Sequence, residues 1–419
     1  MHVYFKNTIF ARDFMKHRVQ KTDAIYQLLT FILLASMSMP VAADDFHADS
    51  ATVSLLTCSG GREVYEQYGH TAIRFNNNRG TDITFNYGVF DFNTPDFVYR
   101  FIKGETDYQL GIEPFEYFRS SYARRGSEVR EQVLNLTSDE KVRLFQSLCV
   151  NFQPENRIYR YNFFYDNCTL RARDMIEESV EGGIKYNGFD ADVPAEETVS
   201  YRDIIHHYNS FDPWNSFGID MLLGSGADAC ITDKKKMFAP QYLSSSFRKA
   251  KKDNGEAIVA SDSVVVAASE DTLKPVVTVL TPSTVFAILL LLSVVACYYE
   301  FKKKTSYWIV NSIIYLAQGL AGCIIAFLST CSVHPTVDSN WLVWVFNPLP
   351  LLAIPYIIYR GVKNRECAYH RCAFVVIALF LIAMPLIPQK FVLPHYLLVM
   401  LLLSRSAVPA YYQFLKYKK

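Results

Sequence analysis

The last third of the chain is a series of long apolar stretches separated by short polar loops. Five such stretches occur, at residues 275–299, 305–337, 339–359, 372–389 and 391–415. Each is long enough for one helix of about 20 residues across a hydrocarbon core of roughly 30 Å. The pattern predicts an all-α transmembrane bundle of five helices over residues 283–419. Arg405 interrupts the fifth stretch, and we expect its side chain to extend toward a membrane surface.

The N-terminus has the pattern of a secretory signal. An apolar run at residues 28–39 follows Lys16, Arg18 and Lys21 and precedes small residues that end at Ala43. This order predicts a signal peptide over residues 1–43, with an uncleaved anchor as the alternative. Residues 44–250 would then form an exported domain, and residues 251–282 would form a linker to the first span.

Basic residues mark alternate loops of the apolar region. With the polar domain outside the cytoplasm, the three inner segments hold ten Lys and Arg residues, whereas the two outer loops hold only Lys390. Because basic residues accumulate in cytoplasmic loops, this distribution gives the same orientation as the signal peptide. We therefore expect a multi-pass membrane protein, with its polar domain outside the cytoplasm and its C-terminus in the cytoplasm.

The formal net charge of +1 hides two unlike parts. Residues 275–419 carry 12 basic and three acidic residues, whereas residues 1–274 carry 30 basic and 38 acidic residues. The basic excess belongs to the membrane loops, so the charge gives no argument for nucleic-acid binding. Aromatic residues make up 15% of the chain, which excludes a disordered protein.

The exported part mixes two hydrophobic periods. Alternating apolar and polar residues predict strands at 53–56, 70–75, 83–92 and 129–136. A turn at residues 76–80 would join the second and third strands as a hairpin. Thr137 and Glu140 have the spacing of a capping box, which predicts a helix that starts there. This mixture predicts an α+β domain.

Cys168 lies where another helix is expected to begin. Asp166 or Asn167 is a suitable N-cap, and an apolar stripe follows from Ala172 onward. A thiol in the first turn meets unpaired N–H groups and the positive end of the helix dipole, which favour the thiolate. An imidazole within hydrogen-bond reach would complete an activated nucleophile. From these residues alone, the alternative that Cys168 and the strand residue His70 only pack in a core stays open.

Two motifs together carry a family resemblance. The chain resembles the Lnb family of bacterial lipoprotein N-acyltransferases in YGHTAIR at residues 68–74 and in YDNCTLR at residues 165–171. Its tail resembles the membrane domain of that family, including His334-Pro335 and Asn340. The resemblance implies a permuted papain-like fold with the His on a strand and the Cys at a helix N-terminus. In that fold His70 and Cys168 are the catalytic pair.

The resemblance also implies a reaction and its partners. An acyl chain would move from a membrane phospholipid, through a thioester on Cys168, to the N-terminal amine of a diacylglyceryl-cysteine lipoprotein beside the lipid bilayer. The cysteines of the exported domain lack metal-binding spacings, and we expect no metal and no cofactor. Two alternatives remain, a membrane-anchored thiol hydrolase or amidase of the cell envelope and a non-enzymatic membrane-anchored binding protein.

Several neighbours of these motifs are expected to assist. Asn167 and Asp91 are expected to support catalysis, and the residue that orients His70 could be Asn86, Tyr87 or Asp91. Expected substrate-binding residues lie in the two motifs and in the loop between spans two and three; they are Arg74, Tyr165, His334, Asp338 and Asn340.

Overall fold

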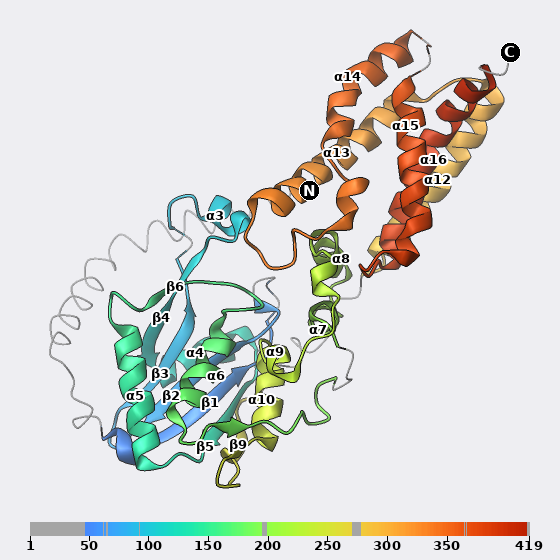
Figure 1. Ribbon diagram of the computed structural model, residues 1–419. Coiled ribbons are helices and arrows are strands. Elements are labelled where there is room, and N and C mark those ends of the chain that lie inside the picture. The colour runs from blue at the N-terminus through green and yellow to red at the C-terminus, as the bar shows by residue number, and fades with distance from the viewer. Residues whose placement is uncertain are drawn as a thin grey trace.

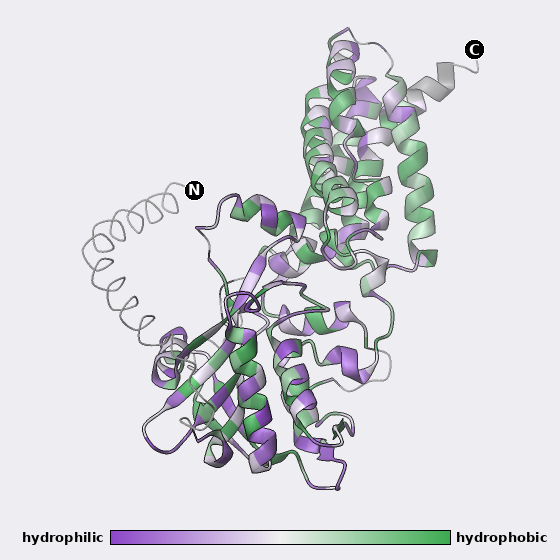
Figure 2. Cartoon of the chain, turned by 60° about the vertical axis from the view of Figure 1, so that its left-hand side comes forward, coloured by the Kyte–Doolittle hydropathy of each residue, from purple (hydrophilic) through white to green (hydrophobic). Residues whose placement is uncertain are grey.

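The fold is given by a computed structural model and has two parts, a polar α+β domain and a helical bundle that extends from it (Figure 1). The bundle is mostly hydrophobic, whereas the α+β domain mixes both kinds of residue (Figure 2). The described residues are 47–416, apart from Arg62, Val64, Tyr65, Phe92, 195–198, 270–277, Asn364 and Glu366. The predicted signal peptide, residues 1–43, lies outside them.

A seven-stranded antiparallel sheet forms the centre of the α+β domain. Its strand order is β6-β4-β3-β2-β1-β5-β9. The strands are β1 (Thr52–Cys58), β2 (His70–Asn76), β3 (Asp82–Val89), β4 (Asp107–Pro114), β5 (Val129–Leu134), β6 (Ile158–Arg160) and β9 (Val259–Val266). A separate pair is formed by β7 (Ile184–Lys185) and β8 (Lys251–Lys252). The predicted hairpin is confirmed, because β2 pairs with β3.

Helices cover both faces of the sheet. The larger core lies under α5 (Ser138–Phe152), α6 (Cys168–Ser179) and α10 (Pro240–Lys249), and the smaller core lies under α4 (Phe115–Arg125). The predicted capping box is confirmed, since Thr137 and Glu140 exchange side chain-to-backbone bonds of 2.8 and 3.2 Å. The remaining short elements are η1 (Ala48–Ser50), α3 (Phe97–Lys103), α7 (Tyr201–Tyr208), α8 (Pro213–Leu222), η3 (Ser225–Ala227) and α9 (Asp233–Lys236). The predicted α+β class is confirmed, and the permuted papain-like relation stays a prediction.

The predicted linker over residues 251–282 is wrong in its first half. Residues 259–266 form β9, which pairs antiparallel with β5 at the edge of the sheet. The sequence pattern hid this strand because half of its residues are exposed and only Val266 is buried. The exported domain therefore extends to Val266.

Five described helices are long and apolar enough to cross a membrane, as predicted. They are α12 (Pro282–Lys303), α13 (Trp308–Cys331), η4 (Trp341–Trp344) with α14 (Leu349–Val362), α15 (Ala368–Ala383) with η5 (Met384–Leu386), and α16 (Leu393–Lys416). Both loops predicted to be outside lie against the exported domain. The Val333 N–H donates to the Lys103 carbonyl at 2.8 Å, and the Lys390 N–H donates to Asp228 at 3.1 Å.

The expectation for Arg405 is wrong. Its side chain is fully buried between helices instead of reaching a membrane surface. It donates to both oxygens of Glu300 on α12 at 2.8 and 2.9 Å, and to Asn311 on α13 at 2.8 Å. A paired carboxylate at this position neutralises the guanidinium inside the apolar bundle, which removes the reason for the side chain to extend toward water.

Candidate active site

Cys168 is the first residue of α6, and Asn167 fixes the turn before it. The Asn167 side-chain oxygen accepts from the Thr169 and Leu170 N–H groups at 2.9 Å each. Its amide nitrogen donates to the carbonyls of Phe163 and Phe238, also at 2.9 Å. All these bonds are buried or partly buried, so the helix start is held from both sides. The cap does not use the Cys168 N–H, which stands at the positive end of the helix dipole.

His70 begins β2 and is oriented by Asn86 of β3. The His70 Nε2 and the Asn86 Oδ1 are 2.8 Å apart. The same Oδ1 accepts from the Gly88 N–H at 2.8 Å, and the Asn86 Nδ2 donates to Glu113 at 3.3 Å. Because these contacts fix the amide with its oxygen toward the ring, Nε2 is the protonated nitrogen and Nδ1 is left for the thiol. Of the three candidates for this role, the structure brings Asn86 to the ring.

A glycine makes room for the ring. A Cβ atom added at Gly88 would lie 2.5 Å from the His70 Cε1 and 3.1 Å from its Nδ1. The pairing of β3 with β4 shifts register between Asn86 and Val89, at this same place. The irregular strand and the missing side chain therefore allow the imidazole to lie between Asn86 and Cys168.

The buried Cys168 thiol and the partly buried His70 ring form a pair with opposite pKa shifts. Burial opposes ionisation of the thiol, but the His70 ring and hydrogen bonds from His70, the Thr71 N–H and the Thr169 hydroxyl hold the pKa of Cys168 below its ordinary value. Burial likewise opposes protonation of the ring, but the Cys168 thiolate and the bond to Asn86 raise the pKa of His70. Both shifts favour the thiolate–imidazolium form, which is the reactive form of a cysteine nucleophile.

Two threonines assist the thiol and were missed by sequence reasoning. The Thr71 and Thr169 hydroxyls are 3.1 Å apart, and the Thr169 oxygen lies 3.9 Å from the Cys168 sulfur. Each follows its catalytic neighbour in the sequence. A search for small hydroxyl residues directly after the His and the Cys would have found them.

The thiol opens into a narrow, mainly aromatic pocket. Cys168 is 8% exposed. The pocket is lined by Tyr68, Tyr161, Phe163, Tyr208 and Phe238, together with Gly69, Asn167, Thr169, Ala239 and Pro240. An apolar lining around an ion pair excludes water and favours an apolar substrate group.

Comparisons with known families identify both parts of the chain. Residues 39–210 match the family described as the Lnb N-terminal periplasmic domain, and residues 274–418 match the Lnb transmembrane domain. The chain belongs to the Lnb family. No curated protein and no solved structure matches it. Membership supports a multi-pass membrane protein with a periplasmic domain and a function like that of a lipoprotein N-acyltransferase.

Two of the predicted residues do not come to the pocket of this Lnb protein. Asp91 stabilises its own turn, since its side chain accepts from the Asn93 N–H at 2.8 Å and its carbonyl accepts from the Thr94 hydroxyl at 2.8 Å. Arg74 is committed to structure, with bidentate bonds to Asp82 at 2.6 and 2.8 Å.

The remaining contacts of Arg74 are structural as well. Its other terminal nitrogen donates to both oxygens of Glu131 at 2.9 and 3.0 Å, and its guanidinium lies 3.6 Å from the centre of the Phe115 ring. Arg74 was expected to bind substrate, but a guanidinium with these partners on α4 and β5 has no donor directed at the thiol.

The loop between spans two and three joins the two domains of the Lnb protein. The His334 Nε2 donates to the Phe101 carbonyl at 2.7 Å. Asn340 is buried, and its Nδ2 donates to the carbonyls of Met221 and Leu222 at 2.9 and 3.2 Å. These two predicted substrate residues therefore hold the loop on α3 and α8 in this structure.

Asp338 of the same loop is exposed, and its charge acts on Tyr165. Burial raises the pKa of Tyr165, and the nearby Asp338 carboxylate raises it further. Tyr165 is itself exposed and lies three residues before Cys168. Of the five predicted substrate residues, Asp338 and Tyr165 are thus linked by charge, and neither lines the Cys168 pocket.

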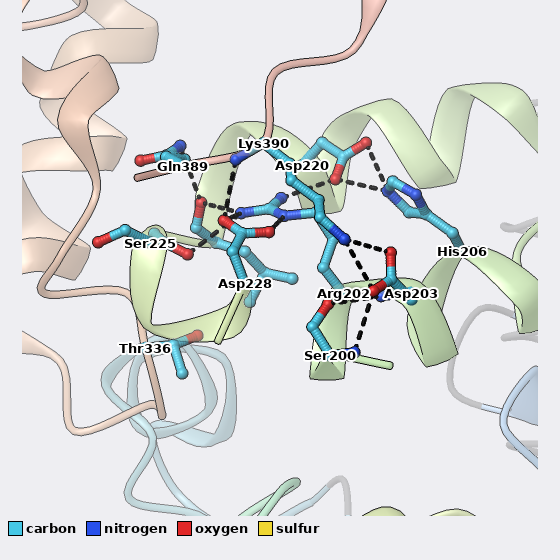
Figure 3. Close-up of polar contacts among 12 residues, drawn as sticks. Ser200, Arg202, Asp203, His206, Asp220, Ser225, Asp228, Thr336, Gln389 and Lys390 are labelled. Atoms are coloured by element: carbon cyan, nitrogen blue, oxygen red, sulfur yellow. Dashed lines mark hydrogen bonds and ion pairs between the residues drawn. The ribbon is translucent and has the colours of Figure 1, made fainter. Parts of the chain in front are cut away.

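An ion cluster with a buried centre links the membrane domain to α7 (Figure 3). Arg202 is fully buried and donates to Asp220 and Asp228 at 2.7 Å each. Lys390, in the turn between α15 and α16, donates to Asp203 at 2.8 Å and contacts Asp228 through its backbone N–H. The buried charges fix α7 against α8, because buried charges require their partners. The exposed Lys390–Asp203 pair and the Lys390 N–H then link these helices to the turn before the last span.

The same segment reaches the catalytic pocket from its other side. Tyr208, at the end of α7, lines the pocket, and the Asn209 side chain donates to the Tyr68 hydroxyl at 2.9 Å. The Asn215 side chain on α8 donates to the Gln67 side chain, which lies just before β2. The membrane domain of the Lnb protein is thus connected to the residues that precede His70.

Proposed function

We propose that this protein is a lipoprotein N-acyltransferase of the bacterial inner membrane, with a membrane phospholipid as acyl donor and a diacylglyceryl lipoprotein as acceptor. The observation that carries the proposal is the buried Cys168–His70 pair, oriented by Asn86 and joined to a five-helix membrane domain. Membership of the Lnb family supports the same class of reaction. A thiol nucleophile beside the bilayer suits a reaction in which both substrates are lipids.

In the first half-reaction the Cys168 thiolate attacks an ester carbonyl of the phospholipid. The new C–S bond gives a tetrahedral oxyanion. The Cys168 N–H, at the start of α6, is the helix-terminal donor that stabilises this oxyanion. The ester C–O bond then breaks, and the His70 imidazolium gives its proton to the leaving oxygen. The products are a thioester on Cys168 and a lysophospholipid.

In the second half-reaction the α-amine of the lipoprotein attacks the thioester. His70, now neutral, takes one proton from the amine as the C–N bond forms. The C–S bond breaks, and the sulfur leaves as the thiolate, which the regenerated imidazolium stabilises. The product is an amide, and the enzyme returns to its starting form.

The test is detection of the thioester on purified protein. Incubation with phospholipid vesicles alone should add one acyl chain to the Cys168 peptide, and neutral hydroxylamine should remove it.

Mass spectrometry of lipoprotein N-termini in cells should show the N-acyl form with the wild-type protein and not with Cys168→Ala. Transfer of acyl chains by Cys168→Ala at the wild-type rate would refute the mechanism. Release of free fatty acid with no N-acyl product would indicate the thiol hydrolase instead.

A further inference from the structure

Helix α3 presents apolar side chains to the surroundings instead of to a core. None of its seven residues is buried. Val98 is 70% exposed, and Tyr99, Phe101 and Ile102 are exposed as well. A short helix with this many exposed apolar side chains is unusual on a surface that faces only water.

The position of α3 explains what this apolar surface faces. Its last turn is hydrogen-bonded to the loop that follows α13, through Val333 to the Lys103 carbonyl at 2.8 Å and through Ser332 to the Ile102 carbonyl at 3.1 Å. The Tyr99 ring lies 6.4 Å from the ring of Phe327 on α13. Helix α3 therefore lies beside the outer end of a membrane span (Figure 1), and its apolar residues continue the surface of that span.

A row of aromatic rings runs inward from α3. Phe101 stacks on Phe97 at 6.1 Å between ring centres, Phe97 on Phe90 at 5.9 Å, Phe90 on Tyr108 at 4.8 Å, and Tyr108 on Tyr161 at 4.2 Å. Tyr161 lines the Cys168 pocket. The row is therefore continuous from the membrane-side helix to the catalytic thiol.

A cavity accompanies this row. Its volume is about 260 Å³, and Val89, Phe90, Phe97, Tyr108 and Ile158 supply its apolar lining. The cavity lies between α3 and the ends of β3 and β4, which is the interval between the membrane surface and the Cys168 pocket. Concave, mostly apolar spaces of this kind are typical binding sites for apolar ligands.

The charges beside α3 are already paired. Arg100 donates to Asp107, which also accepts from Arg160 at 2.8 Å. Lys103 lies 2.7 Å from Glu105. Arg100 and Arg160 share Asp107, and Lys103 has Glu105, so all three cations already contact a carboxylate and the surface offers apolar contact more than a site for an anionic headgroup.

We propose that α3, the cavity behind it and the aromatic row form the binding site for the acyl chain of the donor phospholipid. The chain leaves the outer leaflet over Val98, Tyr99 and Ile102 and lies along Phe97, Phe90 and Tyr108. Its ester carbonyl then reaches Cys168 past Tyr161. This inference rests on the proposed acyl transfer, for which it names the path of one substrate.

The first test is photocrosslinking with the full-length protein. Cys168→Ala, which cannot turn over, is incorporated into vesicles of phosphatidylethanolamine and phosphatidylglycerol that carry a diazirine within one acyl chain. After irradiation, the labelled peptides should contain Phe90, Phe97 or Tyr108. Labels confined to the membrane helices, or labels on the opposite wall of the Cys168 pocket at Tyr208 and Phe238, would overturn the proposal.

The second test separates the path from the chemistry. The double variant Phe90→Ala/Phe97→Ala should form the Cys168 thioester at least about tenfold more slowly with long-chain phospholipid vesicles, because two apolar contacts are lost. With a water-soluble short-chain phospholipid, which does not need the path, its rate should equal that of the wild type. Tyr117→Ala, which removes an exposed aromatic from α4, is the matched control and should leave both rates unchanged.

Equal slowing with both donors would show that the double variant harms the active site, and equal rates with both would show that the chain takes another route. Either result would overturn the proposal. If the wild type formed no thioester with either donor, the acyltransferase function itself would fail, whereas crosslinks at Phe90 or Phe97 would still report a bound acyl chain.

Discussion

Two buried thiols lie at the same end of the sheet and have opposite properties. Cys58 ends β1 directly opposite His70 in the strand pairing, is fully buried, and packs under α4. Burial raises its pKa far above the ordinary range, and the hydrogen bond with Tyr122 offsets this only in part. Cys168 is almost as buried, yet its pKa is lowered. Burial therefore does not decide the reactivity of a thiol here, and the charges and donors around the sulfur do.

Replacement of each sulfur should give the largest contrast. Cys168→Ser should reduce acyl transfer by at least about 10³-fold, because an alcohol lacks the ionised nucleophile that the site stabilises. Cys58→Ser should leave the acyl-transfer activity per amount of folded protein unchanged. The measurement is acyl transfer per amount of membrane-inserted protein. Equal losses in both variants would mean that the two cysteines act as one unit.

Asn86→Ala should have the next largest effect. Without the amide oxygen, the His70 ring loses its fixed tautomer, and we expect a decrease in kcat on the order of 10²-fold, the lower range for a positioned acid–base group. Asn86→Asp keeps an acceptor and should restore part of the rate while it moves the acid limb of the pH profile. A merely structural role would give a stability loss with an unchanged profile in both variants.

The pH dependence of alkylation should sharpen the contrast between the two thiols. Because the pKa of Cys168 is lowered, its reaction with iodoacetamide should continue below the pH range of an ordinary thiol and decline only as pH falls through that lowered pKa. In His70→Ala the imidazolium is lost, burial dominates, and the profile should move to higher pH. Cys58 should stay unmodified in the folded protein throughout. Profiles of Cys168 that coincide with and without His70 would contradict the paired thiolate.

The smallest expected effect is that of Tyr122→Phe. The change removes the hydroxyl that bonds with Cys58 but keeps the ring in the core under α4. The free energy of unfolding should fall by about 1 kcal/mol, the net value of one neutral hydrogen bond. Thermal unfolding measures it, and Tyr99→Phe, on the exposed face of α3, is the control. A loss of acyl transfer without a loss of stability would show that Cys58 takes part in the reaction.

Local patterns predicted the elements that carry His70 and Cys168. The alternation at residues 70–75 placed His70 on a strand, and the cap before Cys168 placed the thiol at a helix start, since each signal depends on neighbours within a few residues. The five spans followed from length and hydropathy. The residue that orients His70 could be narrowed only to three candidates. The choice of Asn86 among them depends on the register of β3 against β4 and on the bond to Glu113.

Distant pairings account for what sequence reasoning missed. The partner of Arg405 is Glu300, 105 positions away on another helix. Likewise β9 is positioned by its pairing with β5, and only one of its own residues is buried. A sequence pattern alone does not show which distant residues come together. An Arg405 side chain that extends toward the membrane surface and a long linker were therefore the simplest interpretations.

The late strand β9 has a consequence for biogenesis. It supplies the outermost position of the sheet, and α12 begins only 16 positions after Val266. Until residues 259–266 have left the translocation channel, β5 remains an open edge with unpaired N–H and C=O groups, which is a site for aggregation. The periplasmic domain therefore completes its folding while the first span is entering the lipid. An excised periplasmic fragment should be soluble only when it includes Val266, and one that stops at residue 250 should aggregate.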